Sequence, residues 1–197
     1  KLVALRKAHP DDIGLMILEG DFYSAQNDHQ TAGDKFAAIL ALHPEHNIAL
    51  AKYYQVTLEG VHLDTFSDIL TTLLENNPDN HFQRNILADH LVNIGQYEKA
   101  RPHYEMLVEK EDLPNYIFIL NNLANIYIES DLNKAESLIN KASAINGNHA
   151  VIIDTVGWIK ALRGDLDEAL TMLRQAYAMS SEDPSIKYHL AYTLHKL

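Results

Sequence analysis

Residues 150–183 read AVIIDTVGWIKALRGDLDEALTMLRQAYAMSSED, and this stretch decides the fold. In its first half, apolar residues recur at helical spacing until Gly164 and Asp165 break the pattern, as the C-terminal end of a helix does. In its second half, residues 166–177, apolar and small residues recur at i, i+3, i+4 and i+7. The stretch therefore predicts two amphipathic helices joined by a short turn.

Small side chains mark the point where these two helices should cross. Gly157 lies in the first helix and Ala169 in the second. Small residues at a crossing allow two helix axes to approach to the lower end of the usual ~8–10 Å range. We expect a bulky residue at either position to force the pair apart.

The same unit recurs along the chain with a 34-residue period. The step from Ala135 to Ala169 equals this period, whereas the step from Ala100 to Ala135 is longer by a single position. Neither helix of a unit can bury its apolar stripe alone, so each hairpin needs the next one to cover it, and the hairpins must stack. Three prolines share the 34-residue spacing, and they are Pro10, Pro44 and Pro78.

In this combined spacing the sequence resembles the tetratricopeptide-repeat (TPR) family, whose 34-residue unit has one small residue in each helix and a proline near the boundary. The resemblance covers nearly the whole chain. It implies an all-α fold, a right-handed superhelical solenoid of antiparallel helix pairs. The matching segments are Leu87-Ala88 with Gly95-Gln96-Tyr97 and Ala100, Leu123-Ala124 with Tyr127 and Ala135, Val156-Gly157 with Gly164-Asp165-Leu166 and Ala169, and Gly20 with Tyr23, Ala32, Phe36 and Pro44.

We expect residues 1–197 to form a single TPR array that is cut from a longer one, because both ends interrupt a repeat. The partial repeats would be 1–12 and 184–197. Their uncovered apolar stripes would give the fragment a surface for homodimerisation. The complete repeats are assigned to residues 13–46, 47–80, 81–116, 117–149 and 150–183.

Three repeats depart from the pattern. In repeat 47–80 the 34-residue register places Tyr54 and Phe66 at the small positions, whereas a shift of the first helix by three residues would restore a small residue and lengthen the turn. The sequence leaves both registers open, so no binding residues are assigned there. Repeat 117–149 lacks the turn glycine, which predicts a turn one residue shorter. Pro102 is expected early in its helix, where a missing N–H is tolerated.

The composition excludes several classes of protein. The chain contains 16 Lys and Arg against 27 Asp and Glu, a net charge of −11, which argues against a nucleic-acid-binding surface. It has no Cys, so disulfides, thiolate metal sites and cysteine nucleophiles are excluded. No apolar run approaches the roughly 20 residues that span a bilayer.

The TPR resemblance also implies where a partner would bind, because the first helices of such repeats line a concave groove. Asn carboxamides can pair with the main chain of an extended ligand, and aromatic rings provide contact area. The groove positions of residues 13–183 contain no Lys or Arg, so the expected ligand is neutral or basic, and a clamp for acidic tails is excluded. The predicted groove residues are Phe82, Asn85, Asp89, Phe118, Asn121, Asn125, Asp154, Trp158, Tyr188 and Tyr192.

An alternative interpretation remains for the same residues: the Asn side chains are simply solvated, and Trp158 packs against the neighbouring repeat. No catalytic residues, cofactor or metal site are predicted. The His residues are scattered without the spacing of a metal site, and nucleotide-binding and nucleophile motifs are missing.

Three functions follow from these observations. The favoured one is a scaffold for protein–protein interaction that binds a neutral or basic peptide or protein in the groove. A second is an assembly component of an envelope or exopolysaccharide-export system, because residues 154–158 and 188–191 are similar to bacterial TPR lipoproteins of exosortase and exopolysaccharide loci. That similarity implies a periplasmic setting. The third is an enzyme whose catalytic domain lies outside these residues, in which case the array could present a polymer to it.

Overall fold

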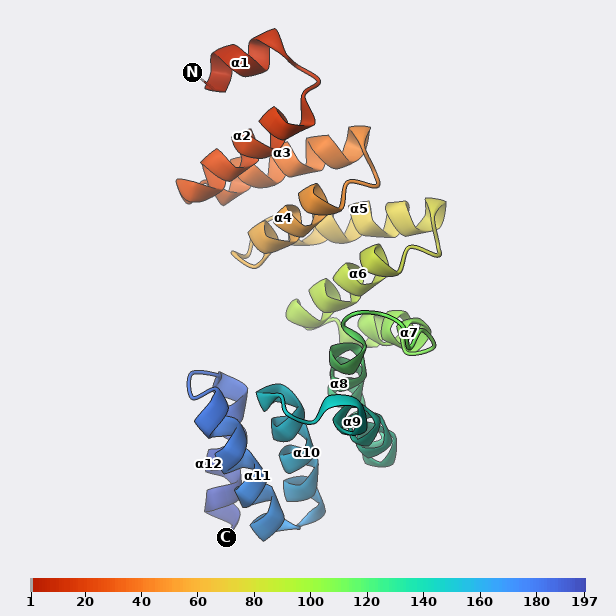
Figure 1. Ribbon diagram of the computed structural model, residues 1–197, viewed down its shortest axis with the longest axis vertical. Helices are drawn as coiled ribbons and strands as arrows, with labels where there is room; N and C mark the ends of the chain where they lie inside the picture. Colours follow the sequence, from red (N-terminus) through yellow and green to blue (C-terminus); the bar gives the residue numbers. More distant parts are fainter. Residues whose placement is uncertain (1) are drawn as a thin grey trace. The chain divides into compact units, whose positions relative to one another are not determined.

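The computed structural model describes residues 2–197, with side chains from residue 5 onward, so Lys1 of the partial repeat 1–12 lies outside the described residues. This part of the chain is built of α-helices and contains no strand (Figure 1). The helices are α1 (Leu2–Ala8), α2 (Ile13–Ala25), α3 (His29–Leu42), α4 (Asn47–Thr57), α5 (Leu63–Asn76), α6 (His81–Asn93), α7 (Tyr97–Leu107), α8 (Tyr116–Tyr127), α9 (Leu132–Asn146), α10 (Ala150–Arg163), α11 (Leu166–Met179) and α12 (Pro184–Lys196).

The chain divides into two compact units, residues 1–100 and residues 101–197, and the division falls inside α7. In the first unit, α2 pairs with α3, α4 packs against α3, and α6 packs against α5. In the second unit, α8 pairs with α9 and α10 with α11, and α12 packs against α10 and α11. This architecture confirms the predicted fold class, an all-α solenoid of antiparallel helix pairs.

The helix starts keep the period of the sequence. First helices begin at residues 13, 47, 81, 116, 150 and 184, and second helices at residues 29, 63, 97, 132 and 166. Each series advances by the same period throughout, apart from one step that is longer by a single position. Because α4 and α5 begin one full period after α2 and α3, repeat 47–80 has the unshifted register, in which Tyr54 and Phe66 occupy the small positions.

Short polar side chains begin many of the helices. The carboxylate of Asp12 accepts a hydrogen bond from the Leu15 N–H at 2.9 Å, which satisfies one of the N–H groups that the first turn of α2 leaves free. Asp28, Asn80, Asp131 and Asp183 cap α3, α6, α9 and α12 in the same way. These caps stabilise the first turn of each of these five helices.

Gly157 shows why the crossing position is small. A Cβ atom at this residue would lie 3.0 Å from Cγ of Leu173 and 3.2 Å from Cβ of Met172, both on the paired helix α11. Gly20 on α2 has the same role, since its Cβ would lie 2.5 Å from the ring of Phe36 on α3. Both helix pairs therefore approach closely because no side chain stands between them.

Repeat 47–80 lacks this close crossing. Phe66 is fully buried at the small position, and its ring meets that of Tyr53 edge-on at 4.9 Å and lies 6.1 Å from that of Tyr54. The backbones of α4 and α5 approach each other much less than those of α2 and α3 or of α10 and α11. A bulky residue thus separates this pair, as expected from the packing argument.

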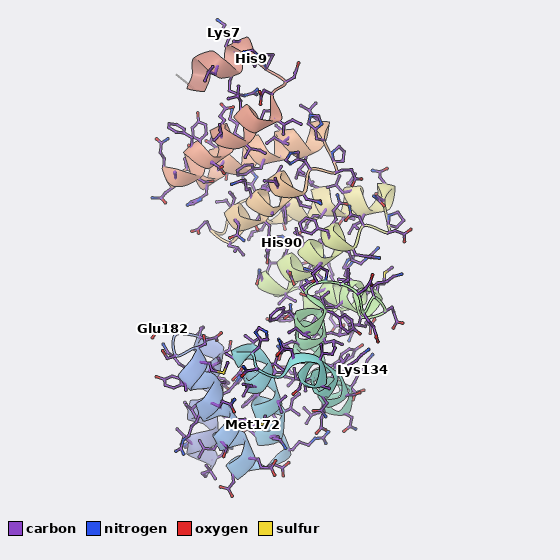
Figure 2. The ribbon with its side chains drawn as sticks, in the orientation of Figure 1. Lys7, His9, His90, Lys134, Met172 and Glu182 are labelled. Atoms are coloured by element: carbon purple, nitrogen blue, oxygen red, sulfur yellow. The ribbon has the colours of Figure 1, made fainter. Side chains whose placement is uncertain are left out.

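The imidazoles of His62 and His90 pack beside the rings of Tyr53, Tyr54 and Phe66, and together these side chains form an aromatic layer. The Nε2–H of His62 donates to the carbonyl of Gln30 at 2.9 Å, and its Nδ1 lies 3.1 Å from the hydroxyl of Tyr53, so its ring ties α3 to α4. His90 lies on α6 (Figure 2), and it is 1% exposed. Its Nε2–H donates to the carbonyl of Leu63 at 2.9 Å, and its ring meets that of Phe66 at 5.0 Å. Polar side chains therefore fill the space that the splayed pair opens.

The placement of Pro102 differs from the expectation. Pro102 is the sixth residue of α7, so it lies beyond the first turn, where N–H groups are free in any case. It cannot donate to the carbonyl four residues earlier, and α7 continues through it without that bond. The sequence placed Pro102 too early because the proline alone does not show where the helix begins.

Replacing Gly157 by Val tests the close crossing. We expect the free energy of unfolding to fall by about 1–3 kcal/mol, because the added methyl groups overpack the contact with Leu173. Urea unfolding followed by far-ultraviolet circular dichroism measures the change. Ala178→Val, at an exposed position of the neighbouring helix, is the control. Equal stability of the two variants would contradict the packing argument.

Burial of His90 predicts a pH dependence of stability. Desolvation lowers the pKa of His90 below its ordinary value of 6.5, outweighing the opposing effects of its bond to Leu63 and of nearby Asp64. The unfolded chain therefore binds the proton more readily, and the stabilisation is present above pH 6.5 and lost as pH falls through the folded pKa. In urea unfolding at pH 5 and 7.5, His90→Gln should reduce the loss at pH 5, whereas His195→Gln, at an exposed position, should not.

Candidate functional site

The predicted groove residues all lie on first helices. Because α6 belongs to the first unit and the others to the second, the two surfaces are described separately. Phe82, Asn85 and Asp89 lie on α6, Phe118, Asn121 and Asn125 on α8, Asp154 and Trp158 on α10, and Tyr188 and Tyr192 on α12.

On α6, two predicted residues bind each other. The Nδ2–H of Asn85 donates to Oδ2 of Asp89 at 2.9 Å, which holds the carboxamide in one orientation. The Oδ1 of Asn85 is buried and accepts no hydrogen bond in the structure. Phe82, one turn earlier, is 43% exposed. This face thus combines a large apolar surface with an unused acceptor.

On α8, Asn121 is more deeply buried than expected for a residue that lines an open groove. Its side chain is 5% exposed, and its Oδ1 accepts no hydrogen bond. A buried acceptor without a partner costs about 1–3 kcal/mol, so such groups are uncommon in native proteins. Phe118 lies on the same helix, is 38% exposed and meets the ring of His149 edge-on at 5.3 Å. Asn125 is exposed.

Asp154 on α10 is also buried, and its partner was missed in the sequence. Both carboxylate oxygens lie within hydrogen-bonding distance of Nδ1 of His189 on α12, at 2.9 and 3.0 Å. Asp154 was predicted to line the groove, but the residue is 5% exposed and its carboxylate is bound by His189. The helical spacing gave no signal for this pair, because it joins two successive first helices rather than two positions of one helix.

Trp158 packs against the same histidine. The two rings stack at 4.3 Å with an interplanar angle of 15°. Tyr192 and Tyr188 meet Trp158 edge-on at 5.0 and 5.9 Å. We call Trp158, Tyr188, His189 and Tyr192 the aromatic cluster. Trp158 therefore packs against α12, the first helix of the next repeat, as in the alternative interpretation, whereas Tyr188 is 60% exposed.

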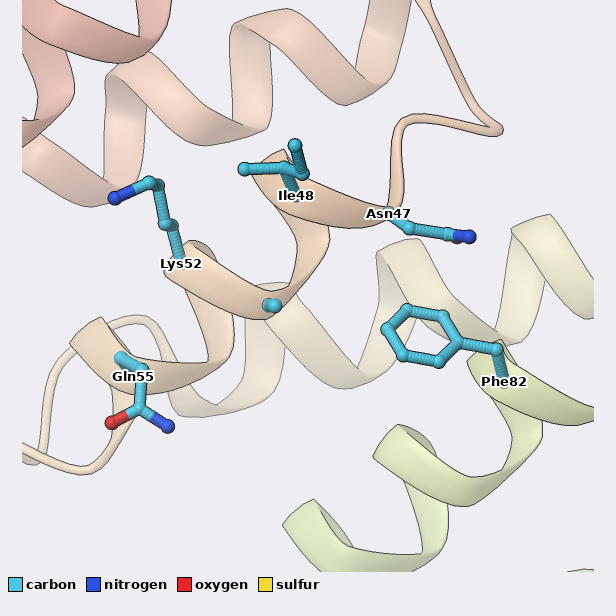
Figure 3. Close-up of a pocket in the computed structure, with 6 residues that line it drawn as sticks. Asn47, Ile48, Lys52, Gln55 and Phe82 are labelled. Atoms are coloured by element: carbon cyan, nitrogen blue, oxygen red, sulfur yellow. The ribbon is translucent and has the colours of Figure 1, made fainter. Parts of the chain in front are cut away.

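The structure also contains a hollow on α4, where the sequence left the register open. We call it the α4 hollow (Figure 3). Its volume is about 390 Å³. The unshifted register, had it been chosen, would have placed Ile48, Ala51 and Gln55 among the groove positions. The hollow is lined by Asn47, Ile48, Ala51, Lys52 and Gln55 of α4 and by Phe82 of α6.

Within the described residues, no three His, Asp or Glu side chains converge in a way that could hold a metal ion. None of the helices in that part of the chain is long and apolar enough to cross a membrane. The arrangement of first-helix side chains is chemically suited to binding, with amide acceptors beside aromatic surface.

A double-mutant cycle tests the bond between Asp154 and His189. Because both side chains are largely buried, we expect Asp154→Ala and His189→Ala to be coupled by about 1–3 kcal/mol in the free energy of unfolding. Urea unfolding of the two single variants and the double variant gives this coupling. Additive effects of the two substitutions would show that the pair contributes no stability of its own.

Comparisons with known proteins agree with this architecture. No family model matches the chain. An uncharacterized protein of Pyropia yezoensis, ycf37, is 34% identical over 117 residues, which are 55% of this chain and 64% of that protein. The chain thus spans somewhat less than two thirds of this relative.

Solved structures with the same fold are more numerous. A TPR protein from Parabacteroides merdae has a TM-score of 0.67 at 18% identity, covering 98% of this chain and 75% of its own. YrrB, described as a TPR protein with an unusual peptide-binding site, has a TM-score of 0.64 at 18% identity. The match covers 100% of this chain and 98% of YrrB. Yeast Tom70 has a TM-score of 0.71 at 17% identity, and the match covers 99% of this chain and 42% of Tom70. The chain therefore has the fold of TPR proteins.

Proposed function

We propose that this chain is a scaffold for protein–protein interaction, which binds an extended peptide segment of its partner along its first helices. The observation that carries the proposal is the buried Oδ1 of Asn121, which accepts no hydrogen bond within the chain. A main-chain N–H of a bound peptide would supply the missing donor once the carboxamide of Asn121 turns towards the surface. The free energy lost in the unliganded protein would then be recovered on binding.

The surroundings of Asn121 support this role. Phe118 lies three residues earlier on α8 and leaves 38% of its surface exposed, so an apolar ligand group could cover it. The other nitrogen and oxygen atoms of an extended peptide would remain available to water. The likeness to YrrB adds support at the level of the fold, because that protein is described as having a peptide-binding site.

The ligand is proposed to be neutral or basic. Two acidic residues of first helices, Asp21 on α2 and Asp154 on α10, already have partners within the chain, which are Lys52 at 2.7 Å and His189. The preference therefore rests on the net charge of −11, which raises the local concentration of cationic ligands and lowers that of anionic ones.

A second candidate is an assembly component of an exopolysaccharide-export system that contacts the polymer. The aromatic cluster favours it, because both motif segments, residues 154–158 and 188–191, contribute to this one set of contacts. The exposed ring of Tyr188 offers a surface on which a sugar could stack. A change in Trp158 fluorescence on titration with maltohexaose, removed by Tyr188→Ala, would favour this candidate over the peptide.

Asn121→Ala tests the peptide proposal. Peptides selected from a random 12-residue library against the wild-type chain should bind Asn121→Ala about tenfold more weakly in isothermal titration, the value of one hydrogen bond near 1.4 kcal/mol. The free energy of unfolding should stay the same or rise, because Asn121 Oδ1 accepts no bond in the unliganded chain. Asn140→Ala, exposed on α9, is the matched control. Unchanged affinity of Asn121→Ala would contradict the proposal.

A further inference from the structure

We infer that the α4 hollow in the first unit is a pocket for one aliphatic side chain of a basic peptide segment. The site lies mainly on repeat 47–80, to which the sequence assigned no binding residues. It shares only Phe82 with the predicted groove residues, and it involves none of the side chains of α8, α10 or α12. The inference shares the proposed class of ligand, a peptide, but it rests on separate residues and can fail separately.

The hollow exists because Ala51 is small. At the corresponding position, counted by the repeat, α6, α8 and α10 carry Asn85, Asn121 and Asp154, whose side chains extend two bonds or more beyond Cβ. The side chain of Ala51 ends at Cβ, so the space above it stays open. Figure 3 shows this space between α4 and the ring of Phe82, which extends from α6 towards α4.

The walls of the hollow are apolar and accessible. Ile48 is 59% exposed and Phe82 is 43% exposed, although both side chains are large and hydrophobic. Covering such surfaces stabilises a complex because apolar area is removed from water. The volume of about 390 Å³ lies in the lower part of the range of about 300–1,000 Å³ that is typical of ligand pockets. It suits a single side chain with its adjoining backbone rather than a folded element.

The polar rim can bind a peptide backbone. Asn47 and Gln55 lie at the two ends of the α4 lining, both are exposed, and their carboxamides can donate and accept. Figure 3 shows their side chains extending from the α4 ribbon. Main-chain groups on either side of an inserted side chain could therefore pair with these amides.

The negative charge of residues 1–100 favours basic residues on either side of the inserted side chain. Lys52 is the only cation in the lining, and its Nζ lies 2.7 Å from Oδ1 of Asp21, so it is neutralised within the chain. Residues 1–100 contain seven Lys and Arg against fourteen Asp and Glu. The resulting negative potential favours a segment with Lys or Arg next to the inserted side chain and disfavours acidic neighbours.

Methyl-detected NMR of the full chain tests the pocket. The probes are three capped nine-residue peptides: Gly-Lys-Gly-Lys-Leu-Lys-Gly-Lys-Gly, the same peptide with Ser in place of Leu, and the same peptide with Glu in place of every Lys. We expect the first peptide to shift the methyl signals of Ile48 and Ala51 in a saturable way. The Ser peptide should bind about tenfold more weakly, as expected when a leucine side chain stays in water. The Glu peptide should not bind.

Two matched variants complete the experiment. Ala51→Leu fills the hollow and should abolish the difference between the Leu and Ser peptides, whereas Ala38→Leu, exposed on α3, should preserve it. Asn121→Ala should leave the response at Ile48 intact, which separates this pocket from the proposed function of the second unit.

Several results would overturn the inference. These are no shift with the Leu peptide at millimolar concentration, equal binding of the Leu and Ser peptides, equal binding of the Glu peptide, or an unaltered response in Ala51→Leu. Shifts of Ile48 and Ala51 that depend on protein concentration without peptide would assign the hollow to a second copy of the chain instead.

Discussion

The close crossing of the two helices of a hairpin, as in α2–α3 and α10–α11, is the contact on which the rest of the structure depends. At Gly20 the ring of Phe36 occupies the space that a Cβ would need, and at Gly157 the side chain of Leu173 does so. Because the two backbones approach this closely, their apolar stripes form one continuous surface that the next hairpin can cover. A regular stack requires this geometry to recur, and the helix starts keep one period along the chain, apart from one step that is longer by a single position.

Repeat 47–80 shows what happens when the constraint is relaxed. Phe66 occupies the small position, and the backbones of α4 and α5 approach less closely. His62 and His90 complete the aromatic layer. The Nε2–H of His62 donates to the carbonyl of Gln30 on α3, and the Nε2–H of His90 donates to the carbonyl of Leu63 on α5. The repeat therefore keeps its place in the period although its interior is more polar, and its stability becomes linked to the protonation of a buried imidazole.

The first helices carry buried polar side chains of two kinds, those with a hydrogen-bond partner inside the protein and those with an unused acceptor. The sequence alone does not distinguish the two kinds. Asp154 is satisfied within the protein by His189, so it joins two repeats. Asn121 is equally buried but leaves an acceptor unused, and only this kind of residue calls for a partner from outside. A bound partner would therefore pair with amide acceptors rather than with acidic residues. Trp158 packs within the protein beside its exposed neighbour Tyr188.

The sequence by itself determined the all-α hairpin architecture, because helical periodicity, small residues at the crossings and helix-ending residues are local features of the chain. It also placed the predicted site residues on the first helices. Only the tertiary structure decided the register of residues 47–80, since Tyr54 and Phe66 violate the pattern and an aromatic–histidine layer compensates for them. It also revealed the pairing of Asp154 with His189 and the hollow above Ala51. These features depend on which side chains of neighbouring repeats meet in space, and spacing along one helix does not contain that information.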